Sequence, residues 1–297
     1  MKKNKIKKSA GDYIFTVINT ICMIIFSIIM LYPLWYVVIA SFEDFTTLLA
    51  KGNEILLWPE SPSFDAYKMT FSNSNIITGY GVTIFVTVMG TVLGVLASCL
   101  GGYFGSRKNV KLGKFIMLMM IFTMYFGGGL IPNYFNVKSF GLDNSIWALI
   151  IPTMIGTYNT ILMRSSFEAL PRSLEESAEI DGAGHWTVLF KIVLPIAKAT
   201  IAVIALYYAV AKWNEWFNAM IYIKDAAKRP LQLVLRDILM AGSMEGMNMM
   251  AGAEEAAAVA EKLKYSTIVV ATLPILCVYP FIQKYFVKGV TIGAVKG

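Results

Sequence analysis

Long apolar runs are the feature that most constrains how this chain folds. A helix needs about 20 mainly apolar residues to cross the ~30 Å hydrocarbon core of a bilayer, and residues 13–39 contain no charged side chain. Only 15% of the 297 residues are Asp, Glu, Lys or Arg, and 57% are hydrophobic, whereas about a quarter of a soluble domain is charged. The sequence therefore predicts an all-α integral membrane protein.

Six apolar stretches are candidate transmembrane helices. The second contains Gly90-x-x-x-Gly94, a common spacing that suits close helix packing. The third is interrupted by Gly127-Gly-Gly129 and Pro132, so it either continues with a kink or breaks there. A break at membrane depth is tolerated only against protein or a water-filled cavity, so this segment either faces a pathway or forms a loop at the outer end. The predicted spans are residues 13–39, 76–104, 115–135, 145–163, about 200–218 and 266–287.

The basic residues predict the topology. Six spans place both termini on one side of the membrane, and cytoplasmic loops carry an excess of Lys and Arg. The side that holds the termini carries five lysines in the first eight residues, and it also has the basic residues Arg107, Lys108, Lys111, Lys114, Arg164, Arg172, Lys191, Lys198, Lys284, Lys288 and Lys296. Both termini are therefore expected in the cytoplasm.

Composition excludes several other classes of protein. The formal charge of +7 comes from residues that flank apolar runs, which does not resemble a nucleic-acid-binding face. The first apolar run greatly exceeds the 7–15 residues of a signal-peptide core, so an uncleaved first span is favoured. Cys22, Cys99 and Cys277 lie in apolar stretches and predict buried thiols. His185 is the sole histidine, so no metal site is expected.

A polar segment, residues 174–195, lies between two apolar runs. Ser173 is a candidate N-cap with Glu176 at the reciprocal position of a capping box. The pattern predicts a short helix from residue 174, which Gly182 ends because glycine adopts a positive φ readily. A second short helix is expected over residues 186–193. Ile180, Trp186 and Leu189 are candidate apolar contacts for a partner.

This segment resembles the cytoplasmic EAA loop of permease subunits of binding-protein-dependent ABC importers. The family pattern is Glu-Ala-Ala, three residues, Gly, nine residues and Ile-x-Leu-Pro. Here it is matched by Glu176-Ser177-Ala178, Gly182 and Ile192-Val-Leu-Pro195, with Ser177 in place of the middle Ala. Further stretches resemble the carbohydrate branch, namely the maltose-type second permease and the complex-polysaccharide and aldouronate-type permeases: residues 32–35, 128–132, 213–218, 230–236 and 293–297.

The resemblance implies a type I ABC importer transmembrane domain in a bacterial cytoplasmic membrane. Its implied partners are a second homologous permease, two ATP-binding cassette ATPases, an extracytoplasmic solute-binding protein and a carbohydrate substrate, namely an oligosaccharide. The chain lacks Gly-x-x-x-x-Gly-Lys-Ser/Thr, so we expect no enzyme activity and no cofactor, with ATP and Mg bound by partner subunits. The residues implied in coupling to the ATPase are Glu175, Glu176, Ala178, Ile180, Asp181, Gly182, Ala183, Leu194 and Pro195.

Aromatic and amide side chains form a second cluster near the end of the fifth span. Pyranose C–H faces pack on aromatic rings while the hydroxyl groups take hydrogen bonds, so this cluster is a candidate part of the substrate pathway. An outer gate or an interfacial aromatic belt explains the same residues. They are Trp213, Asn214, Glu215, Trp216 and Asn218.

The expected organisation has three parts: residues 1–75 with the first span and an extracytoplasmic loop, residues 76–290 as the core permease with the coupling loop 171–198, and the tail 291–297. The resemblance implies that residues 224–264 reach the binding protein and that the tail lies between the ATPases. The alternative function is an ion-coupled secondary transporter, which predicts paired charges at mid-membrane. A membrane enzyme would need a carboxylate, His or Ser constellation, and none is evident.

Overall fold

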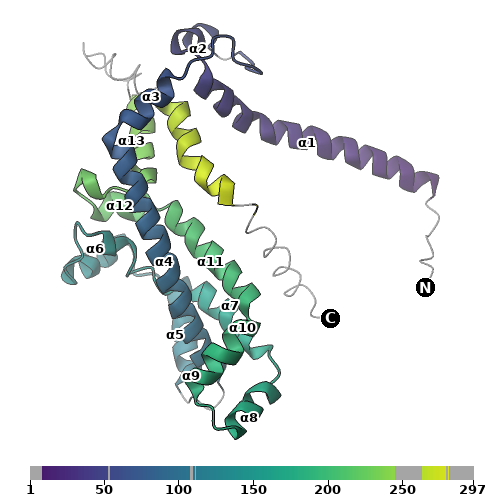
Figure 1. Cartoon of the computed structure of the whole chain (residues 1–297), viewed down its shortest axis with the longest axis vertical. Helices are drawn as coiled ribbons and strands as arrows, with labels where there is room; N and C mark the ends of the chain where they lie inside the picture. The colour runs from purple at the N-terminus through teal and green to yellow at the C-terminus, as the bar shows by residue number, and fades with distance from the viewer. Residues whose placement is uncertain are drawn as a thin grey trace. The chain divides into compact units, whose positions relative to one another are not determined.

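The computed structural model describes residues 9–52, 54–107, 110, 112–244, 263–278 and 280, and the regular elements within these ranges are helical. This confirms the all-α class (Figure 1). Residues 245–262 of the segment implied to reach the binding protein, the end of the sixth span and the tail 291–297 lie largely or wholly outside these residues. In chain order the helices are α1 (Ala10–Phe42), α2 (Phe45–Lys51), α3 (Asp65–Ser72), α4 (Ser74–Ser106), α5 (Gly113–Tyr125), α6 (Leu130–Ser139), η1 (Ile146–Leu149), α7 (Thr157–Glu168), α8 (Ser173–Ile180), α9 (His185–Val188), the π-helix η2 (Leu189–Val193), α10 (Leu194–Ile196), α11 (Lys198–Trp213), α12 (Phe217–Tyr222), η3 (Ala226–Lys228), α13 (Leu231–Met244) and a last helix, Leu263–Val278.

Two helices of the described chain, α1 and α4, are long and apolar enough to cross a membrane. A third candidate is the pair His185–Ile196 and Lys198–Trp213, which is bent by 83° at its break. The predicted first, second and fifth spans therefore correspond to apolar helices. The number of six spans and their topology remain predictions.

The third and fourth predicted spans are interrupted. Helix α5 ends at Tyr125 and α6 begins only after Gly129, whose φ is +86°, so the chain breaks here and does not continue as one kinked helix. The expectation of one helix over residues 145–163 is wrong. Residues 150–156 separate η1 from α7, because Pro152 lacks a backbone N–H and disfavours helical conformation in the residue before it.

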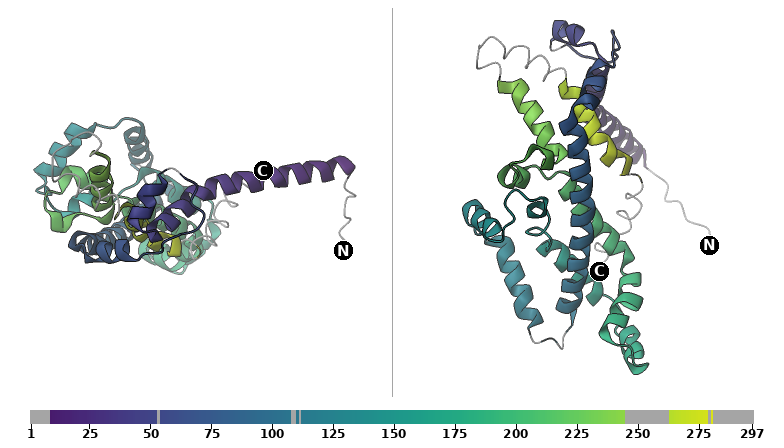
Figure 2. Two further views of the ribbon diagram at one scale, coloured as in Figure 1. Left: turned by 90° about the horizontal axis from the view of Figure 1, so that it is seen from above. Right: turned by 60° about the vertical axis from the view of Figure 1, so that its left-hand side comes forward.

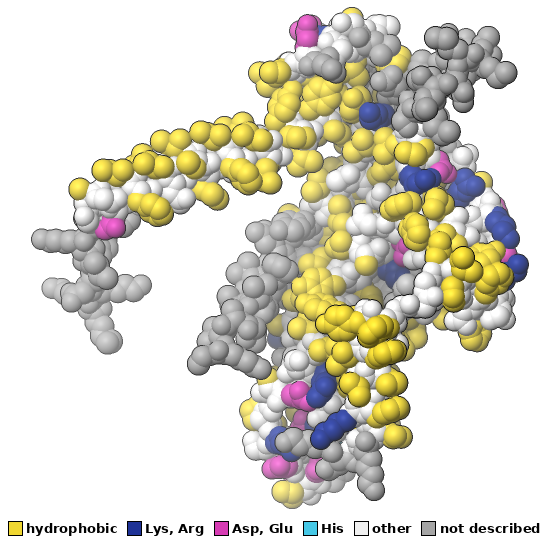
Figure 3. Space-filling view, turned by 180° about the vertical axis from the view of Figure 1, so that it is seen from behind, with side chains coloured by type: hydrophobic (Ala, Val, Ile, Leu, Met, Phe, Trp, Pro, Cys, Tyr) yellow, Lys and Arg dark blue, Asp and Glu magenta, His cyan; other side chains and the backbone are white. Residues whose placement is uncertain are grey.

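The chain divides into two compact units. The first comprises residues 1–72 and 241–270. Within it, α1 exposes apolar side chains along most of its length (Figure 3). The loop after α1 is anchored by the buried carboxylate of Glu43, which accepts hydrogen bonds from the backbone N–H groups of Glu60 and Ser61 at 2.9 and 2.7 Å. The hydroxyls of Thr70 and Ser266 lie 2.8 Å apart.

The second unit comprises residues 73–240 and 271–297, and α4 is its central helix. Helices α7 and α11 pack along α4 (Figures 1 and 2). They approach closely because Gly90, Gly94 and Gly102 leave room: a Cβ at these positions would lie 2.7 to 3.0 Å from atoms of α11 or α7. The Gly90-x-x-x-Gly94 spacing therefore does serve helix packing.

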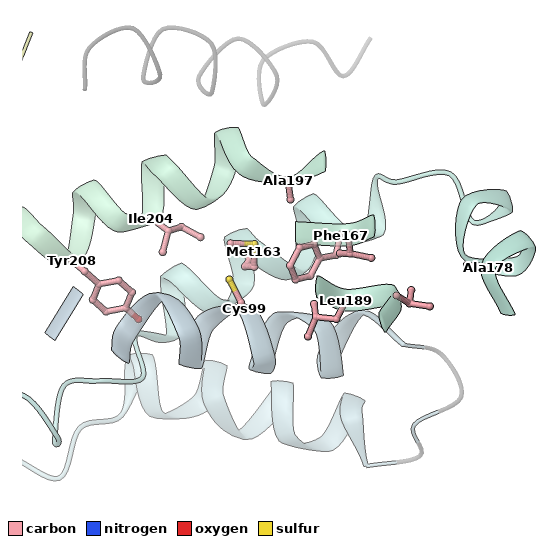
Figure 4. Close-up of a cluster of buried hydrophobic side chains, with 10 residues drawn as sticks. Cys99, Met163, Phe167, Ala178, Leu189, Ala197, Ile204 and Tyr208 are labelled. Atoms are coloured by element: carbon pink, nitrogen blue, oxygen red, sulfur yellow. The ribbon is translucent and has the colours of Figure 1, made fainter. Parts of the chain in front are cut away.

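The largest core cluster lies in this second unit. Figure 4 shows side chains from α4, α7, α8, η2 and α11 in one apolar layer. It extends from Tyr208 to Leu189 and Ala178, so the middle of the helix bundle and the predicted coupling loop share a core. Its buried members are Cys99, Met163, Phe167, Ala178, Val188, Leu189, Val193, Ala197, Ile204 and Tyr208.

Residues 224–264, which the resemblance assigns to contact with the binding protein, begin with ordered structure. Helix α13 buries Leu231, Leu233 and Val234. The backbone N–H of Leu231 donates to the hydroxyl of Thr83 on α4 at 2.8 Å. The start of this segment is thus part of the packed second unit.

Substitution of the α4 glycines tests this packing. The Cβ of Gly102→Ala would lie 2.9 Å from the backbone nitrogen of Arg164 on α7, and overpacking of this kind costs about 1–3 kcal/mol. We expect this variant to lower the midpoint of thermal unfolding, measured by loss of the monodisperse peak in size-exclusion chromatography. Gly81→Ala has nothing within 4 Å of the added Cβ and should match or exceed the original midpoint. Equal midpoints for the two variants would contradict the close contact between α4 and α7.

Candidate functional site

Helix α8 begins at Ser173, one residue earlier than expected, and its N-cap is Arg172, which makes no side-chain capping hydrogen bond. The predicted capping box is therefore wrong, because Ser173 already lies inside the helix. Glu175 and Glu176 in the first turn instead place negative charge near the positive end of the helix dipole.

The end of α8 agrees with the prediction in detail. Gly182 has a φ of +80°. The N–H of Gly182 donates to the carbonyl of Glu179 at 3.0 Å, and that of Ala183 donates to the carbonyl of Ala178 at 2.9 Å. These two bonds form a Schellman motif, which requires a left-handed residue at the position of Gly182.

The second helix of the loop changes its winding toward its end. It runs from His185 through the π-helix η2 into α10, and so extends beyond the predicted end at residue 193. Pro195 contributes to this change because it has no N–H for an i→i−4 hydrogen bond. The chain then bends by 83° into α11. The loop is thus joined directly to a long helix of the core.

The inner face of α8 is attached through an ion pair. Glu175 is buried and pairs with Arg107, which directly follows α4. The guanidinium carbon of Arg107 lies 4.1 Å from the ring centroid of Tyr103. Burial lowers the pKa of Arg107 from its ordinary value, and the neighbouring carboxylate offsets part of the cost of burying its charge. The sequence placed Arg107 on the same predicted side of the membrane as Glu175, but it did not predict that the two residues form a pair.

The outer face of the loop exposes both charged and apolar groups. Ile180 is 86% exposed and Trp186 is 67% exposed, and the Trp186 ring stacks on that of Phe190 with centroids 6.0 Å apart. Leu189 was expected on this face, but it is only 1% exposed because the helix turns it into the core cluster. Charged side chains gather at the end of this unit that carries α8 (Figure 3, bottom).

The remaining predicted coupling residues divide between the two faces. Ala178 is buried in the core, and Ala183 and Leu194 pack against it. Glu176, Asp181, Gly182 and Pro195 are exposed. A pocket of about 1110 Å³ is lined by residues of α4, α7, α8 and α9. Its lining includes Tyr103, Phe104, Arg107, Phe167, Glu168, Arg172, Glu175, Glu176, Glu179, His185 and Trp186.

The second predicted cluster surrounds the turn between α11 and α12. Trp213 is half-buried and its Nε1 donates to the carbonyl of Ala271 at 3.3 Å. Glu215 accepts hydrogen bonds from the backbone and side-chain amides of Asn218 at 3.3 and 3.0 Å. Asn214 and Trp216 are exposed. The structure therefore brings Glu215 and Asn218 together, whereas Trp213 belongs to the packing.

A helical membrane protein with interrupted apolar segments and a helix–glycine–helix loop fits the class of membrane permeases. Residues 90–292 match the family described as "binding-protein-dependent transport system inner membrane component". The chain belongs to this family. It is a multi-pass protein of the bacterial inner membrane and the non-catalytic permease component of its transporter.

Known relatives match along nearly the whole chain. The Bacillus subtilis "polygalacturonan/rhamnogalacturonan transport system permease protein YtcP" is 41% identical over 93% of this chain and 96% of its own length. Protein LplC of the same species is 40% identical over 93% and 94%. A chain of the crystal structure of a bacterial ABC transporter involved in the import of the acidic polysaccharide alginate is 30% identical, with a TM-score of 0.85 and coverage of 95% of this chain and 100% of that one.

The contact between Glu175 and Arg107 yields a test of how α8 is attached. Glu175→Gln leaves Arg107 buried without its counter-charge, which costs about 1–3 kcal/mol. We expect trypsin cleavage after Arg172 to accelerate about tenfold, as local opening becomes easier by roughly 1.4 kcal/mol. Arg107→Met should have a similar effect. Glu176→Gln, which changes a neighbouring exposed carboxylate, should leave the rate unchanged. Equal cleavage of both Gln variants would exclude the ion pair as an anchor.

Proposed function

We propose that this chain is one of two permease subunits of an ATP-driven importer for oligosaccharides derived from plant or microbial polysaccharides. The main support is the 41% identity, over almost the full chain, to a permease named for polygalacturonan and rhamnogalacturonan transport. The alginate transporter chain extends this support to a second acidic polysaccharide. The other subunits would be a homologous permease, two ATPases and an extracytoplasmic binding protein.

The coupling loop transmits the motion of the ATPases in this proposal. Exposed Glu176 and the apolar side chains of Ile180 and Trp186 form the surface that docks on a separate ATPase. Carboxylates suit a basic groove on the partner, and the apolar groups supply buried contact area. Glu175 serves on the inner face, where its pairing with Arg107 holds α8 to α4.

Transport would follow alternating access. Closure of the two ATPases on ATP displaces α8, and the displacement reaches α11 because α9, η2 and α10 lead into it through the 83° bend. A transport cavity between the two permease subunits then opens to a loaded binding protein, and hydrolysis resets the complex. Residues 224–264 would meet the binding protein, and the tail 291–297 would lie between the ATPases. Ion coupling is disfavoured because the ammonium group of the buried Lys212 on α11 donates to a carbonyl and a hydroxyl, while Glu215, whose charge acts on this lysine, accepts hydrogen bonds from Asn218.

Two variants of the loop test the coupling role. Proline cannot adopt the φ of +80° found at Gly182, so Gly182→Pro should disrupt the Schellman motif. Glu176→Lys reverses an exposed charge. We expect both variants to insert into the membrane but to abolish ATP-driven uptake of galacturonate oligomers in reconstituted vesicles. Glu54→Lys, a charge reversal outside the loop, should transport normally. Normal uptake and ATPase stimulation in both loop variants would defeat the assignment.

The proposed topology has six transmembrane helices and both termini in the cytoplasm. Its support is the distribution of basic residues. We expect an epitope tag at either terminus to resist protease added to spheroplasts, and to be digested once the membrane is permeabilised. Digestion of either tag in intact spheroplasts would overturn the topology.

A further inference from the structure

A buried lysine lies at the centre of the second unit. Lys212 of α11 is only 3% exposed. Its ammonium group donates hydrogen bonds to the carbonyl of Leu149 and to the hydroxyl of Thr153. The side chain crosses α4 at Gly90, where an added Cβ would lie 3.0 Å from Cδ and Cε of the lysine. Lys212 therefore binds the residue that precedes the non-helical segment 150–156 and the middle residue of that segment.

A tyrosine one turn earlier on α11 binds the other end of the same segment. The backbone N–H of Gly156 donates to the hydroxyl of Tyr208 at 2.8 Å. This hydroxyl also lies 2.8 Å from the hydroxyl of Ser98 on α4. The Tyr208 ring packs over Gly94, where a Cβ would lie 2.7 Å away. Residues i and i+4 share a helix face, so one face of α11 holds both ends of the break.

A charged side chain and non-helical backbone both cost free energy at this depth in the membrane. Gly90 is the central residue of the 33-residue α4, a helix about 50 Å long, so a membrane-spanning α4 places Lys212 near the middle of the bilayer. Charged groups at that depth are rare and mark functional sites by default. Non-helical backbone at that depth occurs only where it is buried in protein or lines a water-filled cavity.

Several large side chains within and just after the non-helical segment 150–156 are exposed. Ile151 and Ile155 are exposed, and so is Tyr158 in the first turn of α7, at 60%. The ring of Tyr158 lies 6.1 Å from that of Tyr207 on α11. Aromatic faces beside exposed peptide groups can take the C–H faces and hydroxyls of a pyranose.

We propose that Lys212 and Tyr208 are positioning residues for solute passage. They hold residues 150–156 in a non-helical form, and this segment together with Tyr158 forms part of the wall that the saccharide passes at the middle of the membrane. The inference rests on the proposed function as a saccharide permease, and it adds the location of the pathway and the residues that shape it.

The test uses the complete transporter, reconstituted with its second permease, ATPases and binding protein. Lys212→Met keeps the length of the side chain but removes its charge and hydrogen bonds. We expect it to assemble and to keep ATP hydrolysis stimulated by loaded binding protein, while uptake of galacturonate oligomers falls at least tenfold. Tyr208→Phe keeps the ring and should reduce uptake to an intermediate extent. Lys68→Met, at an exposed lysine, is the matched control and should transport normally. Wild-type uptake in both Lys212→Met and Tyr208→Phe would overturn the proposal.

A labelling experiment provides a readout independent of uptake rates. With Cys22, Cys99 and Cys277 replaced by Ser, the thiol introduced by Ile155→Cys should react with a membrane-impermeant maleimide, and galacturonate oligomers should slow the reaction. Added Lys212→Met should abolish this protection by the saccharide. If the thiol stays unreactive in every nucleotide state while one introduced by Ser63→Cys reacts, the segment does not line a water-filled pathway and the proposal fails. If the transporter with Lys212→Met does not assemble, uptake by the Tyr208→Phe transporter and labelling of the Ile155→Cys thiol test the proposal. Absence of ATP-driven saccharide uptake by the wild-type transporter would instead refute the proposed function.

Discussion

Every backbone polar group that lies within a bilayer must find a partner inside the protein, and this constraint shapes the second unit. The chain interrupts an apolar run at residues 150–156, which frees backbone groups that a continuous helix would have paired. Side chains of α11 restore partners at both ends of the interruption, through Lys212 at Leu149 and Tyr208 at Gly156. They reach these groups only because α4 presents Gly90 and Gly94 to them. The glycines, the lysine and the break therefore form one interdependent arrangement.

The proposed coupling loop, residues 174–195, also has two faces with different contacts. Its inner face is attached to the body of the permease by the ion pair of Glu175 with Arg107 and by Ala178 in the core cluster. Its outer face leaves Glu176, Ile180 and Trp186 accessible. A short helix can be both held and available to a partner only when its two faces differ in this way. Two adjacent glutamates thus have different surroundings, and hence different proposed roles.

The two regions are connected through α11. The core cluster extends from Ala178 and Leu189 at the loop to Tyr208 beside the break (Figure 4). Packed interiors transmit displacement because they have few voids and low compressibility. A shift of the loop would therefore reach the face of α11 that holds residues 150–156. Under the proposed function, this continuity is a physical route from an ATPase docked at α8 to the solute pathway.

Local patterns in the sequence were sufficient for the class of fold and for much of the loop. Apolar runs imply membrane helices, and glycine between two short helical patterns implies the turn at Gly182, since these properties depend on neighbouring residues alone. Hydropathy alone could not reveal the break after Leu149, because an apolar run reads alike whether it is helical or interrupted. The local signal for the break was Pro152. The partners of Glu175 and Lys212 lie 68 and about 60 residues away in the chain. Only the tertiary structure decides such pairings, because burial and close helix approach, which no local pattern records, select which polar groups meet.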